Sequence, residues 1–324
     1  MQSLLAEIKT LVHPELASFD LIFKRAIQSR VKFMDIIMGY IIKRKGKQIR
    51  PLFVYLCAGS FGEMTCTTSR GAVLIELLHT ATLVHDDVVD DSNYRRGFLS
   101  INSIWKNKVA VLAGDYLLSR GLLLAVNNGD FELLRIVADA IREMSEGELL
   151  QLEKAKKMNI NESTYFDIIR QKTAVLLSSC CAVGAKSVGA TDEQVLLAKT
   201  FGEKIGIAFQ LRDDLLDYEL SHSGKPASLD IQNRKLSLPL IYGLQRANTI
   251  TRFTMWQKIR RKKKSPLDLS QLTNFAYDGG GIAYTHEKIN QLLEEAKLLL
   301  SSFPPSIYRD YLEKLTDYVI EREH

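Results

Sequence analysis

Apolar residues recur at intervals of three and four positions along most of the chain, the spacing that gathers them on one face of a helix. Leu133, Val137, Ala140 and Met144 are an example. Alternation with a period of two, which is typical of strands, is scarce. Three consecutive glycines at 279–281 predict a break between helices. The pattern predicts an all-α fold, with long helices over residues 73–84, 109–126, 131–152, 165–183, 193–216 and 286–300.

Several of these segments are apolar around most of their circumference, which is typical of central helices in a bundle. Such a bundle can hold a site between its helices, lined by inward-facing side chains. Chain length alone favours about two domains. However, the 19 glycines and 7 prolines do not cluster into a linker, and no repeat stands out. We therefore expect residues 1–324 to form a single domain, a large helical bundle with a central active-site cavity.

Cysteine usage and the N-terminus bear on the compartment. Cys57, Cys66, Cys180 and Cys181 follow neither a disulfide framework nor a zinc-site spacing, which fits a reducing environment. The first residues meet acidic side chains at once and lack the form of a cleavable signal. No apolar run reaches the length of about 18 residues expected of a membrane span. A cytoplasmic location is expected.

The formal net charge of +5 is too small to indicate a nucleic-acid partner, although it suits anionic substrates. Basic residues concentrate in one run at 258–264, just before Ser265 and Pro266. The run is either a solvated helix end or a contact for anionic lipid headgroups. Membrane contact is expected to be peripheral at most.

The first candidate site follows an apolar helical segment and reads His85-Asp86-Asp87-Val88-Val89-Asp90-Asp91. If the helix continues, Asp86 and Asp90 lie one turn apart on one face, with Asp87 beside them. Carboxylates packed this closely need solvent, protons or cations. Hard oxygen ligands of this kind suit Mg²⁺ together with substrate phosphates.

A second cluster repeats the Asp-x-x-x-Asp spacing in another apolar segment, with Asp213, Asp214 and Asp217 after Phe209-Gln210. One cluster alone fits a solvated acidic helix end equally well. The second is flanked by Leu and Phe, which prefer burial and make a poor solvated face. We expect the two clusters to face each other and to hold a diphosphate through several metal ions.

Basic residues that would grip phosphate oxygens accompany the aspartates. Arg can donate two parallel hydrogen bonds to a phosphate, and Lys acts as a compact point charge. Each alone is most often a surface base. Lys172 stands out because it precedes the apolar run Thr173 to Leu177. The candidates are Lys47, Arg50, Arg95, Arg96, Lys172, Lys225, Arg234 and Lys235.

Taken together, these motifs resemble the trans-isoprenyl diphosphate synthases, the polyprenyl synthetase family. The resemblance covers about residues 43–243 in family order, and the helical C-terminal part is compatible with it. The matching stretches are Gly46-Lys47-x-x-Arg50-Pro51, His79, the first Asp cluster with Arg95-Arg96-Gly97, Gly114-Asp115, Lys172-Thr173, Phe209-Gln210 with the second Asp cluster, Gly224-Lys225 through Asp230, and Lys235 before Leu238-Pro239.

The resemblance implies a role for each matched residue. Asp86, Asp87 and Asp90 would bind two Mg²⁺ ions. Asp213 would bind a third, with Asp214 and Asp217 supporting that side. The allylic diphosphate would meet these metals and Arg95, Lys172 and Lys225. Thr173 and Gln210 would line the allylic site, and Lys235 would close over it. Isopentenyl diphosphate would be held by Lys47, Arg50, His79 and Arg96.

The implied reaction needs no protein nucleophile. The allylic carbon–oxygen bond breaks, and metals and bases stabilise the charge on the departing diphosphate. The isopentenyl double bond then attacks the allylic cation, and a proton is lost to the released diphosphate. Apolar walls protect the cation from water. His85, next to the aspartates, is expected to support the metal site from outside it.

The loop at 224–230 departs from the family pattern. Ser228 stands where many members have glycine, and Arg234 stands where glycine commonly precedes the lysine. These differences concern the closing lid, not the reaction.

Product length is expected to depend on the helix that leads into the first cluster. Short-chain members often place Phe or Tyr four or five residues before the first aspartate, and here Thr82 and Ala81 occupy those positions. The local sequence is similar to long-chain members that make quinone side chains. A long product of about seven or eight isoprene units is expected from the resemblance, with a geranylgeranyl or farnesyl product as the alternative.

Three other readings are weaker. A class I terpene cyclase needs no isopentenyl site, so Lys47, Arg50 and Arg96 argue against it. A non-catalytic subunit of a heteromeric synthase typically lacks aspartates that are present here. A non-enzymatic metal-binding protein does not explain the ordered basic residues. The resemblance also implies a homodimer.

Overall fold

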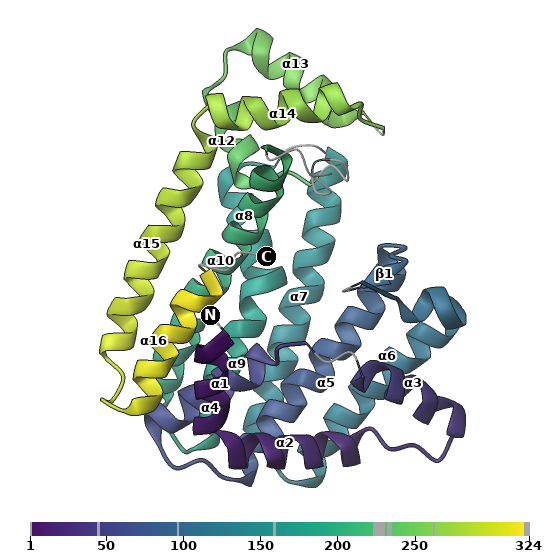
Figure 1. The fold of residues 1–324 in the computed structure, drawn as a ribbon, viewed down its shortest axis with the longest axis vertical. Coiled ribbons are helices and arrows are strands. Elements are labelled where there is room, and N and C mark those ends of the chain that lie inside the picture. Colours follow the sequence, from purple (N-terminus) through teal and green to yellow (C-terminus); the bar gives the residue numbers. More distant parts are fainter. Residues whose placement is uncertain are drawn as a thin grey trace. The chain divides into compact units, whose positions relative to one another are not determined.

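The structure is a computed structural model that describes residues 2–43, 46–95, 97–157, 160–222, 231, 235–261 and 263–320. The prediction of an all-α fold is confirmed (Figure 1). The helices are α1 (Gln2–Leu11), α2 (His13–Ala26), α3 (Lys32–Ile42), α4 (Ile49–Phe61), α5 (Cys66–Val89), α6 (Ile101–Asn127), α7 (Phe131–Lys157), α8 (Glu162–Ile169), the π-helical turn η1 (Arg170–Ala174), α9 (Val175–Ser187), α10 (Asp192–His222), α12 (Leu238–Arg246), α13 (Thr249–Arg260), α14 (Pro266–Asp278), α15 (Gly281–Ser301) and α16 (Ile307–Ile320).

Side-chain caps explain where several helices begin. The Thr65 hydroxyl accepts a hydrogen bond from the Thr67 amide before α5, and Asn248 accepts one from Thr251 before α13. Ser265 and Asp268 form a capping box at α14, whose first residue is proline. The predicted break holds, because α14 ends at Asp278 and α15 begins at Gly281.

The chain divides into two compact units. Unit 1 comprises Met1–Ile141, Leu176–Thr200 and Leu300–Leu315. Unit 2 comprises Arg142–Val175, Phe201–Leu299 and Thr316–His324. The expectation of a single domain stays a prediction.

Helix α5 is the central helix of unit 1, since it packs against α2, α4 and α6. Its neighbour α4 is buried continuously from Pro51 to Ala58, as predicted for helices that are apolar on all sides. Gly184 of α9 allows a close approach to α4: an added Cβ would lie 2.4 Å from the Val54 carbonyl oxygen. Burial of this apolar surface holds α5 and its aspartates in place.

One short strand pair was not predicted. β1 (Tyr94–Arg95) and β2 (Phe98–Leu99) pair antiparallel, with Arg95 opposite Phe98. Gly97 has a φ of 79°, which glycine adopts without steric cost and which turns the chain between the strands. The hairpin carries Arg95 back toward the end of α5.

In unit 2, the helix predicted over 165–183 is interrupted by η1, five residues that include Lys172 and Thr173. Two glycines of neighbouring helices pack closely against this turn. A Cβ on Gly147 of α7 would lie 2.7 Å from the Gln171 Cβ, and one on Gly206 of α10 would lie 2.5 Å from the Ala174 Cα. π-Turns of this kind frequently mark functional sites.

Helix α6 corrects one expectation. An 18-residue window within it reaches a mean hydropathy of 1.7, so the helix is long and apolar enough to cross a membrane by length and composition. The expectation that no segment of that length exists is wrong by this measure. Core helices of soluble proteins pass the same test, and 33% of the window is buried.

Candidate active site

The first aspartate cluster lies where α5 ends. The Asp90 amide donates a hydrogen bond to the Asp86 carbonyl oxygen at 2.8 Å, so the two residues are one helical turn apart, as predicted. Asp86 is half-buried, Asp90 is exposed, and Asp87 is buried. The three carboxylates therefore stand in three different environments within one turn.

Arg95 engages the buried member of the cluster. Its Nε donates to Asp87 Oδ1 at 2.7 Å. Burial raises the pKa of Asp87 above its ordinary value, while the hydrogen bond and charge of Arg95 oppose the shift and the charge of Asp90 adds to it. The structure thus brings together Asp87, predicted as a metal ligand, and Arg95, predicted to contact the allylic diphosphate.

The backbone that follows the cluster is braced from the first turn of α6. Asn102 Nδ2 donates to the carbonyl oxygens of Asp87 at 3.1 Å and Ser92 at 3.2 Å. Ser100 Oγ also donates to the Ser92 carbonyl oxygen, at 2.6 Å. Asn102 is 8% exposed, so these bonds are sheltered from water. Asn102 was not predicted as a site residue, because no spacing rule links it to the aspartates.

His85 packs on α6 through Gly114. A Cβ at Gly114 would lie 2.2 Å from the His85 Nε2, so only glycine admits the ring here. The same nitrogen lies 3.2 Å from the Val111 carbonyl oxygen and 3.5 Å from Asp115 Oδ1. This contact explains why the Gly114-Asp115 pair accompanies the first cluster, and it fits the expected supporting position of His85.

A cavity of about 110 Å³ in unit 1 collects several predicted binding residues. Its lining includes His79, Thr80 and Asp87 from α5, Arg95 from β1, and Gly46, the neighbour of Lys47. Its apolar walls include Phe23, Ile41 and Leu83. The cavity thus combines charged groups with an apolar surface, as a prenyl diphosphate requires.

The remaining predicted residues were assigned to isopentenyl diphosphate (Lys47 and Arg50), to product length (Ala81 and Thr82) and to closure of the allylic site (Lys235). Lys47 is exposed, and Arg50 is half-buried in the first turn of α4. Ala81 is buried at 2% exposure, and Thr82 is half-buried, with its hydroxyl donating to the His79 carbonyl oxygen. Lys235 is exposed. Arg96, Lys225 and Arg234 lie outside the described residues.

The second aspartate cluster lies within α10, where Asp213 and Asp217 are half-buried and one turn apart. Asp214 is buried at 6% exposure, and both of its oxygens accept hydrogen bonds. Tyr165 donates to Oδ2 at 2.6 Å, and Gln210 Nε2 donates to Oδ1 at 2.8 Å.

Gln210 extends this network to the π-turn. Its Oε1 accepts a hydrogen bond from the Thr173 hydroxyl at 2.8 Å. Lys172, the preceding residue, donates to Gln151 Oε1 at 3.0 Å and forms an ion pair with Glu148. The structure therefore brings Thr173, Gln210 and Asp214 together, which were predicted separately. It also adds Tyr165, which the sequence analysis did not consider.

A family model described as polyprenyl synthetase matches residues 31–275, more than half of the chain. The chain belongs to the polyprenyl synthetase family. An all-trans-nonaprenyl-diphosphate synthase (geranyl-diphosphate specific) of Rhodobacter capsulatus is 33% identical over 314 residues, covering 96% of each chain. The predicted family and prenyltransferase chemistry are thereby confirmed.

Solved structures of polyprenyl synthetases share the fold. A decaprenyl diphosphate synthase from Rhodobacter capsulatus superposes with a TM-score of 0.92 and 32% identity, covering 98% of this chain and 100% of the other. A geranylgeranyl pyrophosphate synthase from Bacteroides thetaiotaomicron gives 0.83 and 36%, covering 99% and 100%. The predicted isoprenoid synthase fold is confirmed, and the relatives include both long-chain and short-chain enzymes.

The donor set of this polyprenyl synthetase fits magnesium by chemistry. Within the described ranges no three His, Cys, Asp or Glu side chains are gathered as a metal cluster. Asp86 and Asp90, one turn apart and accessible, and Asp213 offer the hard oxygens that Mg²⁺ prefers. Asp214 is different, because its two oxygens already accept hydrogen bonds from Tyr165 and Gln210.

Tyr165 is expected to act as a positioning residue for the second cluster. Burial and then the charge of Asp214 raise the pKa of its hydroxyl well above the ordinary value, so it remains a donor at neutral pH. Tyr165→Phe should lower turnover by roughly 10- to 100-fold, because it removes a hydrogen bond from Asp214, which supports the proposed metal ligand Asp213. It should also raise the Mg²⁺ concentration needed for half-maximal activity.

Tyr55→Phe is the matched control, because it also removes a buried hydroxyl, one that donates to the Glu15 carbonyl oxygen at 3.0 Å in unit 1. It should leave the magnesium requirement unchanged. An unchanged magnesium requirement in Tyr165→Phe would show that the hydroxyl has only a structural role.

Proposed function

We propose that this polyprenyl synthetase condenses an allylic diphosphate with isopentenyl diphosphate and repeats the reaction to make a long-chain all-trans polyprenyl diphosphate. The observation that carries the proposal is the match over nearly the whole chain to a decaprenyl diphosphate synthase, with both aspartate motifs present. The nonaprenyl synthase relative supports the same product class.

The acidic residues and their basic partners suit the departure of a diphosphate. Magnesium, held by Asp86, Asp87 and Asp90 and by Asp213, with about three ions per site by family resemblance, would neutralise the charge that develops on the leaving group. Arg95, half-exposed beside Asp87, can turn its remaining N–H groups to phosphate oxygens. Lys172 carries a second positive charge, balanced by Glu148 until an anion replaces that partner.

The cavity in unit 1 is the proposed place for isopentenyl diphosphate. Among its lining residues His79 supplies a polar group for the diphosphate of this substrate. Lys47, Arg50 and Arg96 are proposed to complete the set. Phe23, Ile41 and Leu83 exclude water from the prenyl end. The isopentenyl double bond forms the new carbon–carbon bond as the allylic carbon–oxygen bond breaks, and the proton leaves with the released diphosphate.

Binding of the allylic substrate tests this account without turnover. A labelled allylic diphosphate should bind at least about tenfold more tightly with Mg²⁺ than after chelation, because metal-bridged phosphate contacts disappear. Equal binding in both conditions would contradict the role of the aspartates.

Product length is proposed to be set at Ala81 and Thr82. Ala81→Phe should shorten the product, at a stability cost of about 1–3 kcal/mol because the position is buried. Thr82→Phe, at a half-buried position, should shorten it with less strain. Product analysis after dephosphorylation measures both effects.

Ala72→Phe is the control for overpacking. Ala72 is fully buried on the same helix, more than two turns further from the aspartates. It should destabilise the protein without changing the product. Unchanged lengths in all three variants would place the stop on another helix.

We also propose a homodimer. Helix α6 exposes Val111, Leu112, Leu122, Leu123 and Val126 by 40–53%. An apolar face of this extent on one helix is typical of a surface that another chain covers. Pairing of two copies through α6 accounts for its hydropathy without a membrane span, in a cytoplasmic enzyme. Light scattering at the mass of two chains supports this arrangement, and a monomer excludes it.

A further inference from the structure

The positive charge of the chain is concentrated in one stretch. Residues 231–267 contain ten Lys and Arg and no Asp or Glu. Because the whole chain has a formal net charge of +5, the rest of it carries −5. The small overall charge is therefore the sum of a strongly basic segment and an acidic remainder.

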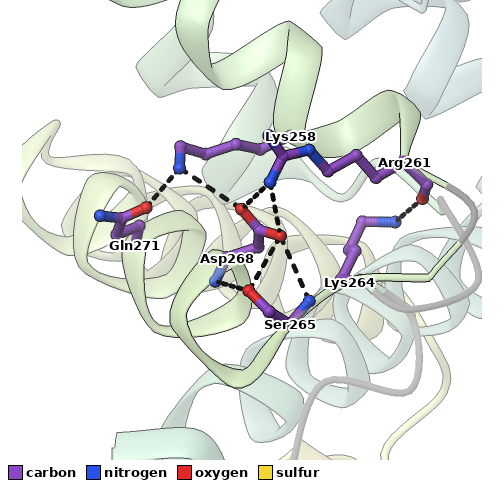
Figure 2. Close-up of polar contacts among 6 residues, drawn as sticks. All are labelled: Lys258, Arg261, Lys264, Ser265, Asp268 and Gln271. Atoms are coloured by element: carbon purple, nitrogen blue, oxygen red, sulfur yellow. Dashed lines mark hydrogen bonds and ion pairs between the residues drawn. The ribbon is translucent and has the colours of Figure 1, made fainter.

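This stretch includes α13 and reaches the first residues of α14, and these two helices pack against each other (Figure 1). The basic run 258–264 joins them. Figure 2 shows how Asp268, at the start of α14, holds the run: Arg261 Nη1 donates to its oxygens at 2.8 and 2.9 Å, and Lys258 lies 3.4 Å away. Lys258 also donates to Gln271.

One carboxylate shapes this turn but does not cancel its charge. Asp268 is 3% exposed and also caps α14 through Ser265. The hydrogen bond from Arg261 holds the pKa of Asp268 well below its ordinary range, so it is an anion at neutral pH. The run contains six Lys and Arg, so five positive charges remain in excess. Arg260 and Lys263 are exposed, and the Arg261 side chain is 56% exposed.

Large apolar side chains project beside these cations. Ile250 is 81% exposed and Phe253 is 64% exposed, and with Arg260 they follow the three- and four-residue spacing of one helix face. Leu267, at the start of α14, is 66% exposed. The outer face of α13 therefore combines isoleucine and phenylalanine with arginine, and the basic run continues it.

This combination matches the surface of an anionic membrane. Polybasic segments are attracted to anionic headgroups, and exposed Phe and Ile gain free energy by entering the headgroup boundary. Nucleic acid would attract the cations but would give no comparable gain to an aliphatic side chain such as Ile250. A long polyprenyl product, which rests on the function proposed above, is poorly soluble in water and needs a lipid phase to leave the enzyme.

We propose that the outer face of α13 and the described residues of the basic run, 258–261 and 263–264, dock on the headgroups of an anionic lipid membrane, which receives the product. The contact is peripheral: Ile250, Phe253 and Leu267 enter the interface, while Arg260 and Lys263 meet lipid phosphates.

Sedimentation with lipid vesicles tests the proposal on the full chain. The protein should bind vesicles of phosphatidylglycerol in phosphatidylcholine and not vesicles of phosphatidylcholine alone. Arg260→Gln with Lys263→Gln should weaken this binding about 30-fold, from the usual contribution of each basic residue near an anionic surface. Arg135→Gln with Lys32→Gln makes the same charge change at exposed positions elsewhere and should change binding by less than about threefold.

The apolar contribution has its own pair of variants. Ile250→Ser with Phe253→Ser should weaken binding at least about tenfold. Phe131→Ser with Ile307→Ser changes the same two residue types at positions 61% and 54% exposed and should have little effect. Circular dichroism confirms that each variant is folded.

Three outcomes overturn the proposal: no binding to anionic vesicles, binding that the control pairs weaken as much as the α13 pairs, or tighter binding to labelled RNA than to vesicles at the same salt. A separate assay of product length in detergent tests the proposed function independently of membrane binding. Vesicle binding without a long product would refute that function, whereas a long product without vesicle binding would refute only the docking surface.

Discussion

Asp86→Asn and Asp213→Asn are each expected to lower turnover by at least about 10²-fold, because each removes a charge that a metal needs while keeping the side-chain shape. Asp86 lies at the accessible end of α5 and Asp213 is half-buried in α10, so neither substitution opens a core cavity. Steady-state rates at saturating substrates measure the loss, and thermal unfolding should be nearly unchanged.

Asp91→Asn is the matched control. Asp91 is exposed, follows the motif directly, and has a φ of 48°, which asparagine also adopts readily. It removes the same charge one residue beyond the proposed ligands and should keep the rate within about twofold of the unmodified chain. Near-normal turnover in both Asp86→Asn and Asp213→Asn would rule out the proposed metal role.

Gly206→Ala is expected to reduce both stability and activity. The added Cβ would lie 2.5 Å from the Ala174 Cα, so the π-turn that carries Lys172 and Thr173 must move. Overpacking of this kind costs about 1–3 kcal/mol. A displacement near 1 Å at a positioning group can cost about 10²-fold in rate.

Gly39→Ala is its control, since nothing lies within 4 Å of a Cβ at that helical position. It should be neutral or should stabilise α3 by roughly 0.5–1 kcal/mol, as alanine does in helix interiors. If Gly206→Ala unfolds at the same temperature as the unmodified chain and keeps its turnover rate, the close packing around η1 contributes neither to stability nor to activity.

Much of the fold could be predicted from the spacing of apolar residues. The segments that become α5, α6, α7 and α10 are long and strongly periodic, so they could be predicted as helices from the sequence. The π-turn within the predicted helix 165–183 could not be found this way. Residues 178–185, which follow it, are all buried, so a shift of one residue in register leaves no visible break in the apolar pattern. The close packing against Gly147 and Gly206 involves residues distant in sequence.

In the candidate site too, some residues could be predicted from the sequence and others could not. Aspartates at a four-residue spacing are visible in the sequence, because a helix converts spacing into a shared face. Their partners are not: Asn102 reaches the Asp87 carbonyl oxygen from the next helix, and Tyr165 reaches Asp214 from α8. Such bonds depend on tertiary packing, which a single sequence does not reveal. The roles assigned to the individual site residues remain predictions.

The central claim is tested most directly by incubating the purified protein with farnesyl diphosphate, labelled isopentenyl diphosphate and Mg²⁺, and measuring the chain length of the dephosphorylated products. We expect a ladder that extends beyond the geranylgeranyl product. A product that stops at geranylgeranyl or shorter would contradict the long-chain assignment, and the absence of any product would contradict prenyl transfer by this chain alone.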